Sequence, residues 1–192
     1  MKVEIEKTER VFDGFLKLDR AVLRHPMPNG QMSPSLMRLN VERGDGAGAL
    51  LVNRHTDTVI LTRQFRYANY LRGDGGFILE IPAGVVPQGK QPEDIARQEL
   101  VEEAGYHLEQ LRFMLMFYAS PGTTTERVFL YYAAVDDSHK QSAGGGLDAE
   151  QEFIEVIEMP IGEAIAKIDR GEIIDAKTVI ALQWYQTHIG RR

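Results

Sequence analysis

The segment at residues 84–106 reads GVVPQGKQPEDIARQELVEEAGY and contains the strongest pattern in the chain. Pro92 fits the first turn of a helix, and the two acidic residues after it stand where the helix dipole favours negative charge. Gly105 is suited to end the helix, because glycine readily adopts the left-handed conformation common just past a helix C-terminus. The pattern therefore predicts a helix that begins at Pro92 and ends at Ala104.

Three carboxylates stand close together on this helix, at Glu99, Glu102 and Glu103. At about 100° per residue they fall on one stripe, where like charges repel each other. No basic residue stands four positions from Glu99 or Glu103 to relieve the repulsion. Oxygen ligands of this kind suit Mg²⁺ or Mn²⁺. The alternative is a solvated acidic helix face, because runs of charge are usually exposed.

The segment in front of the helix favours the metal site. Residues 77–84 read FILEIPAG, which predicts a buried strand closed by a glycine turn. A strand, a turn and an acidic helix in succession place backbone carbonyls beside the carboxylates. A phosphate-binding loop is not indicated, because Gln91 stands where that motif requires a hydroxyl residue.

Together these residues resemble the signature box of the Nudix hydrolases, G-x5-E-x7-R-E-U-x-E-E-x-G-U, in which U is a bulky apolar residue. The positions that match in register are Gly84, Glu99, Leu100, Glu102, Glu103 and Gly105. Three positions depart from it, since Lys90 replaces a glutamate, Gln98 an arginine and Tyr106 an aliphatic residue. In the family that glutamate and arginine mainly brace the box by ion pairing, so their joint loss leaves neither charge unpaired.

The resemblance implies an α/β fold, the Nudix α/β/α sandwich with a mixed sheet, and a Mg²⁺-dependent enzyme for which Mn²⁺ can substitute. The implied metal ligands are Glu99, Glu103, Glu102 and the backbone carbonyl of Ala83. Glu102 is also a candidate for a catalytic role.

Composition narrows the class of protein. The chain has 192 residues, of which 43% are hydrophobic, enough for a sizeable core. The absence of cysteine excludes disulfides, thiolate metal sites and a cysteine nucleophile, and argues against the Nudix-fold isomerases, which use a cysteine. No basic run exceeds two residues, so we expect no nucleic-acid partner. Without a long apolar run or a signal-peptide pattern, we expect no membrane partner and a cytoplasmic location.

Residues 1–45 are expected to form three strands in a small N-terminal antiparallel β subdomain, with residues 46–192 as the Nudix hydrolase domain. Asn29-Gly30 suits a two-residue hairpin turn. Three strands have little core of their own. The unit resembles the N-terminal subdomain of the ADP-ribose and nucleotide-sugar pyrophosphatases, which implies a homodimer and a contribution to the base pocket, with Phe15 and Arg38 as substrate-binding candidates. A plain β-meander on the same subunit is the alternative.

Three further positions resemble substrate contacts of that subgroup. Arg66, in the pattern RQFR, is the candidate for phosphate binding, because a guanidinium can bind two oxygens at once. Glu126 follows a Ser-Pro-Gly turn and three threonines, and Lys177 stands in DAKT, which is similar to the subgroup's DGKT. The alternatives are a surface arginine at Arg66 and a turn-capping acid at Glu126.

Residues 136–150, DDSHKQSAGGGLDAE, predict a long loop. In the relatives a corresponding loop carries the catalytic glutamate, so Glu150 and Glu152 are candidates. Glu152 is favoured because the next strand would anchor it, and an acidic loop end without chemistry is the alternative.

The resemblance implies a pyrophosphatase that hydrolyses the diphosphate bond of a nucleoside diphosphate sugar, such as ADP-ribose or GDP-mannose, to a nucleoside monophosphate and a sugar phosphate. The alternative is a weak or inactive Nudix domain that binds such a compound as a sensor.

Overall fold

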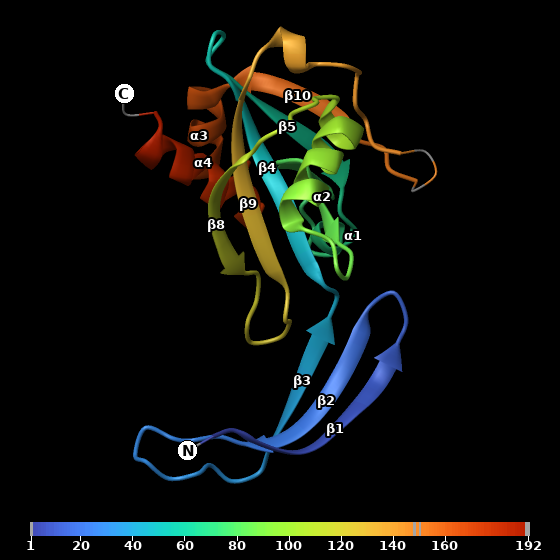
Figure 1. The fold of residues 1–192 in the computed structure, drawn as a ribbon, viewed down its shortest axis with the longest axis vertical. Helices are drawn as coiled ribbons and strands as arrows, with labels where there is room; N and C mark the ends of the chain where they lie inside the picture. The colour runs from blue at the N-terminus through green and yellow to red at the C-terminus, as the bar shows by residue number, and fades with distance from the viewer. Residues whose placement is uncertain (1, 148, 150, 191–192) are drawn as a thin grey trace. The chain divides into compact units, whose positions relative to one another are not determined.

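The computed structural model describes residues 2–147, 149 and 151–190 (Figure 1). The chain divides into two compact units. Unit 1 comprises Met1–Asp45 together with Tyr118–Arg127, and unit 2 comprises Gly46–Phe117 together with Val128–Arg192. No helix in the described part of the chain is long and apolar enough to cross a membrane.

Unit 1 contains a three-stranded antiparallel sheet, as the sequence predicts. Its strands are β1 (Glu4–Asp13), β2 (Lys17–Arg24) and β3 (Leu36–Glu42), in that order across the sheet. No hydrophobic side chain in the described residues 2–45 is fully buried, so the sheet has little core of its own.

The turn between β2 and β3 differs from the prediction. The N–H of Gly30 donates to the carbonyl of Met27 at 2.9 Å, so Pro28 and Asn29 are the central residues of the turn. The predicted two-residue Asn29-Gly30 turn is therefore wrong. Proline decides the position, because its fixed φ suits the first central residue of a turn.

Unit 2 is built on a seven-stranded mixed sheet. Its strands are β4 (Asp45–Asn53), β5 (Thr58–Phe65), β6 (Phe77–Glu80), β7 (Ala83–Val86), β8 (Arg112–Tyr118), β9 (Arg127–Val135) and β10 (Glu155–Pro160). The order is β10-β5-β4-β9-β8, and β6 pairs with β5 while β7 pairs with β4. β4 runs parallel to β9 and antiparallel to β5.

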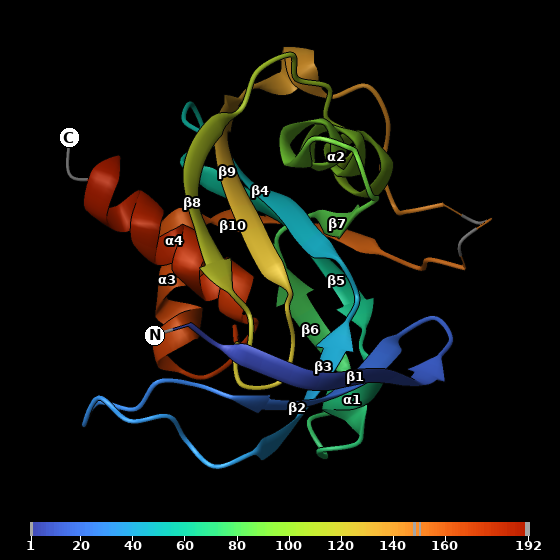
Figure 2. The same ribbon diagram turned by 60° about the horizontal axis from the view of Figure 1, so that its bottom comes forward.

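Helices cover both faces of this sheet (Figure 2). They are α1 (Tyr67–Tyr70), α2 (Pro92–Glu99), the π-helix η1 (Leu100–Ala104), the 3-10 helix η2 (Asp137–His139), α3 (Ile161–Asp169) and α4 (Ala176–His188). Alternate residues of β4 serve opposite faces: Leu50 packs in the core with residues of α3 and α4, whereas Leu51 packs with residues of α2 and η1. The result is the expected α/β/α sandwich.

Two local predictions around the box are corrected. The helix is regular only to Glu99 and continues as a π-helix to Ala104, so its last turn departs from the predicted α-helical spacing. Ala83 and Gly84 lie in strand β7 rather than in a turn, because pairing with β4 holds them extended.

Candidate active site

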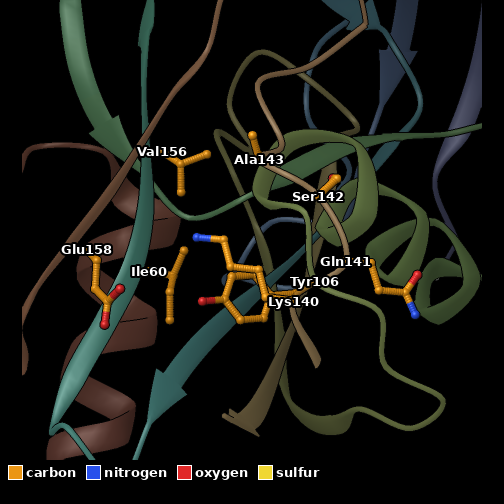
Figure 3. A pocket seen from close by; sticks show the side chains of 8 residues that line it. All are labelled: Ile60, Tyr106, Lys140, Gln141, Ser142, Ala143, Val156 and Glu158. Atoms are coloured by element: carbon orange, nitrogen blue, oxygen red, sulfur yellow. The ribbon is translucent and has the colours of Figure 1, made fainter. Parts of the chain in front are cut away.

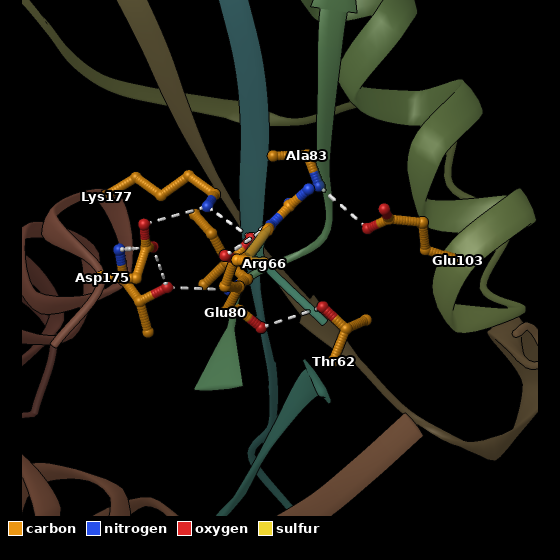
Figure 4. Close-up of polar contacts among 9 residues, drawn as sticks. Thr62, Arg66, Glu80, Ala83, Glu103, Asp175 and Lys177 are labelled. Atoms are coloured by element: carbon orange, nitrogen blue, oxygen red, sulfur yellow. Dashed lines mark hydrogen bonds and ion pairs between the residues drawn. The ribbon is translucent and has the colours of Figure 1, made fainter. Parts of the chain in front are cut away.

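The centre of the candidate site lies where η1 faces β7. Glu103 is only 2% exposed, and its Oε2 accepts a hydrogen bond from the backbone N–H of Ala83 at 3.0 Å. This contact places the main chain of Ala83 beside the Glu103 carboxylate (Figure 4). Two of the predicted metal ligands, far apart in the sequence, are thereby brought together.

Gly84 explains how Glu99 reaches the same place. A Cβ atom at residue 84 would lie 1.7 Å from Oε1 of Glu99, which no real contact allows. The missing side chain therefore lets the Glu99 carboxylate lie against the backbone of β7. The glycine of the box is required here for close approach rather than for a turn.

The electrostatics of Glu103 favour a cation at this point. Burial, and after it the negative charges of Glu99 and Glu152, raise the pKa of Glu103 to about 8, although the Ala83 hydrogen bond and the charge of Arg66 oppose the shift. A carboxyl group with such a pKa is largely protonated at neutral pH. A divalent cation would offset the crowding of negative charge, so the residues present fit a metal.

The described residues contain no group of three or more His, Cys, Asp or Glu side chains arranged to hold a metal. Mg²⁺ usually takes only one or two carboxylates, with waters and substrate phosphates completing its shell. Glu99, Glu103 and a backbone carbonyl suit that pattern. Glu102 accepts a hydrogen bond from Nε2 of Gln98 at 2.9 Å, so the residue that replaces the box arginine contacts a box carboxylate.

A second group of charges adjoins the first (Figure 4). Arg66 donates from Nε and Nη2 to the two oxygens of Glu80, at 2.9 Å and 2.7 Å. Lys177 donates to Oε2 of Glu80 at 2.7 Å and lies 3.0 Å from Oδ1 of Asp175. Burial raises the pKa of Glu80, but the hydrogen bonds and charges of Arg66 and Lys177 outweigh burial and hold it below its ordinary value.

This group also connects α4 to the strand that leads to the box. Asp175 caps α4 by accepting from the N–H of Thr178 at 3.0 Å, and Oγ1 of Thr178 accepts from the N–H of Ile81 at 2.8 Å. The end of β6 and the start of α4 are therefore joined by hydrogen bonds as well as by the Glu80–Lys177 ion pair. Lys177 is held in place by backbone that is itself fixed.

The loop glutamates fall partly outside what the structure describes. Glu152 lies in the described part, and its charge acts on Glu103, which places it in the same group of carboxylates. Glu150, the other candidate, lies outside the described residues.

Three predicted substrate contacts belong to unit 1. Phe15 is 95% exposed, and Arg38 is exposed with its Nη1 donating to the carbonyl of Met37. Glu126 pairs with Arg43 at 3.5 Å within the same unit. The structure thus describes these residues apart from the carboxylates of unit 2.

A separate hollow of about 580 Å³ lies elsewhere in unit 2 and contains none of the predicted site residues (Figure 3). Its lining consists of Ile60, Tyr106, Lys140, Gln141, Ser142, Ala143, Val156 and Glu158. The ammonium of Lys140 lies 5.6 Å from the centre of the Tyr106 ring.

Sequence reasoning missed Glu80, Asp175 and Thr178. Glu80 carried a signal, because a carboxylate inside the apolar run FILEIPAG requires a buried cation as partner. Asp175 and Thr178 stand three residues apart in DAKT, a spacing that suits a helix N-cap. Nothing local identifies Arg66 and Lys177 as the partners of Glu80.

Known proteins share both the sequence and the fold. The NUDIX domain model matches residues 42–182. A GDP-mannose pyrophosphatase of Pectobacterium atrosepticum is 38% identical over 94% of this chain and 92% of its own length. An ADP-ribose pyrophosphatase of Escherichia coli strain K12 is 39% identical over 97% of this chain and 88% of its own. The crystal structure of an ADP compounds hydrolase superposes with a TM-score of 0.75 at 18% identity, covering 100% of this chain and 96% of that one, which concerns the fold alone.

Proposed function

The chain belongs to the NUDIX family, and from that premise we propose that it hydrolyses the diphosphate bond of a nucleoside diphosphate sugar such as ADP-ribose or GDP-mannose. Relatives at 38% and 39% identity carry the names GDP-mannose pyrophosphatase and ADP-ribose pyrophosphatase. Water would add across one phosphorus–oxygen bond of the diphosphate, and the products would be a nucleoside monophosphate and a sugar phosphate.

The observation that carries the proposal is the meeting of opposite charges around Glu103. The negative charges of Glu99 and Glu152 act on this buried carboxylate from one direction, and the positive charge of Arg66 acts on it as well. A substrate with a diphosphate needs a cation to bring it to carboxylates and a fixed positive group to orient its oxygens.

Members of this family generally use divalent metal ions, and we propose Mg²⁺ here, with Mn²⁺ able to substitute. Glu99, Glu103 and the carbonyl of Ala83 would hold it, with Glu102 as a further ligand. When bound, the metal would supply positive charge that offsets the phosphate charge and lowers the pKa of water.

The remaining roles belong to side chains of the chain itself. Glu152 would accept a proton from the attacking water, because it lies within electrostatic range of Glu103. Glu150 and Glu102 are the other candidates for this role. Arg66 would bind a phosphate oxygen through Nη1, because its other two nitrogens are engaged by Glu80. Lys177 would contribute positive charge from the same network.

Unit 1 would supply the rest of the substrate site through a homodimer, with Phe15, Arg38 and Glu126 as the residues concerned. The sheet of unit 1 exposes large hydrophobic side chains, including Ile5 at 66% and Phe12 at 58%. Such a surface on a small sheet favours coverage by a second copy. A cytoplasmic location remains part of the proposal.

The test is an activity assay with Mg²⁺ against a panel of diphosphate compounds, with products identified by phosphorus NMR. Turnover of a nucleotide sugar or ADP-ribose supports the proposal. Tight binding of such a compound without any turnover would support the sensor instead, which no feature of the site favours.

A further inference from the structure

The last turn of the box helix is capped by a single distant loop. The carbonyl of Glu102 accepts from the N–H of Gly146 at 3.0 Å, and the carbonyl of Glu103 accepts from the N–H of Gly145 at 2.9 Å. The carbonyl of Gly105 accepts from the N–H of Gln141 at 2.8 Å. Carbonyls at a helix C-terminus have no partner inside the helix, so loop 141–146 satisfies them directly.

The contact is so close that it requires glycine at two positions. A Cβ at Gly144 would lie 2.4 Å from the carbonyl oxygen of Glu103. A Cβ at Gly146 would lie 2.7 Å from Cβ of Glu152 and 2.9 Å from its Oε2. Both glycines also have positive φ, +71° and +82°, which side-chain-bearing residues rarely adopt.

The same loop holds Glu152 from the other side. The N–H of Ile154 donates to the carbonyl of Gly145 at 3.2 Å, and the N–H of Glu152 donates to the carbonyl of Leu147 at 3.3 Å. The backbone on both sides of Glu152 is therefore bonded to the residues that cap the box helix. No intervening side chain separates the backbone of Glu103 from the loop that carries Glu152.

We propose that Gly144 and Gly146 are positioning residues for the reaction, which place the carboxylate of Glu152 relative to Glu99 and Glu103. The inference rests on the proposed function, in which Glu152 takes the proton from water. Gly144 sets the distance from the loop to the backbone of Glu103, and Gly146 leaves room for the side chain of Glu152. A displacement of about 1 Å at a reacting group can cost on the order of 100-fold in rate.

A purely structural cap would also require these glycines, so the test must separate the two roles. In a structural role, Gly146→Ala would lower the melting temperature and leave the turnover of the folded enzyme unchanged. In a positioning role, it would lower kcat, with little change in KM, and the loss would depend on the presence of Glu152.

The experiment compares Gly144→Ala and Gly146→Ala with Gly162→Ala, a control in α3 where an added Cβ meets no atom within 4 Å. We expect kcat to fall about 10-fold or more for the first two variants, with KM within about threefold of wild type. In a Glu152→Gln background, Gly146→Ala should cause no further loss of residual activity, because the group it misplaces is already inactive. The control should retain wild-type kcat.

Two results would overturn the inference: unchanged kcat in both loop variants, or the same loss from Gly146→Ala with and without Glu152. If a variant does not fold, hydrogen exchange of the wild-type protein decides, since the amides of Gly145 and Gly146 must then be protected and free exchange would refute the contact. Failure of the proposed function is distinct, because wild type itself would then turn over no compound of the diphosphate panel.

Discussion

Arg66 and Glu80 form an ion pair with two parallel hydrogen bonds, at 2.9 Å and 2.7 Å, between the end of β5 and the end of β6. The side chain of Glu80 is only 3% exposed, and it also binds Lys177. One buried carboxylate therefore orients both cations that are proposed to meet the substrate phosphates. The pair is bidentate, which fixes the plane of the guanidinium as well as its position.

Glu80→Gln is expected to weaken both stability and substrate binding. The change keeps the size of the side chain but leaves two cations with one fewer anion. Breaking a fully buried pair costs about 3–5 kcal/mol, and because Arg66 is 40% exposed we expect about 2–3 kcal/mol. Denaturant unfolding measures the loss, and KM for the nucleotide sugar should rise. Glu163→Gln, in an exposed pair with Arg170, is the control and should change stability by less than about 1 kcal/mol.

The same carboxylate predicts a dependence of stability on pH. The folded-state pKa of Glu80 lies below its ordinary value of 4.5, so the folded protein binds fewer protons there than the unfolded chain. Its contribution is therefore fully present above pH 4.5 and is lost as the pH falls through the folded-state value. Unfolding free energies of wild type and Glu80→Gln, measured across this range, should converge at acid pH. A constant difference would contradict the assignment.

Glu103→Gln is expected to separate metal binding from folding. Removing the charge should lower kcat with Mg²⁺ by about 100-fold or more, as for loss of a charged metal ligand. Without metal, the variant should be at least as stable as wild type above neutral pH, because the pKa of about 8 shows that the buried charge is unfavourable there. Thermal unfolding with chelator and with Mg²⁺ tests both points.

Glu109→Gln provides the matched control for that experiment, because Glu109 is an exposed residue outside the carboxylate group. It should keep both the activity and the Mg²⁺-dependent rise in melting temperature. A Glu103→Gln enzyme within about threefold of wild type would exclude Glu103 as a ligand.

The proposed homodimer predicts a specific effect of a change in unit 1. Phe12 is 58% exposed on β1, so Phe12→Ser should leave the monomer folded but weaken association if a second copy covers this sheet. Light scattering should give a dimer for wild type and a shift toward monomer for the variant. A stable wild-type monomer of 21.6 kDa at micromolar concentration would rule out the dimer.

The local pattern of residues 84–106 was sufficient to predict the helix, its glycine end and the carboxylates at Glu99 and Glu103. These features depend on neighbours a few residues away, through helix capping and side-chain spacing, so they can be recognised in the sequence. The alternation of apolar residues likewise predicted most strands of both units, because a half-buried or buried strand imposes it.

Contacts that join distant segments were decided only by the tertiary structure. Glu80 meets Arg66 and Lys177 because β6 pairs with β5 and α4 begins beside the end of β6, and 97 residues separate Glu80 from Lys177. The π-helical turn that leaves Glu103 facing Ala83, and the docking of Gly144–Gly146 on its carbonyls, also depend on packing across the fold. Burial and strand register set these contacts, and neither is encoded in the spacing of neighbouring residues.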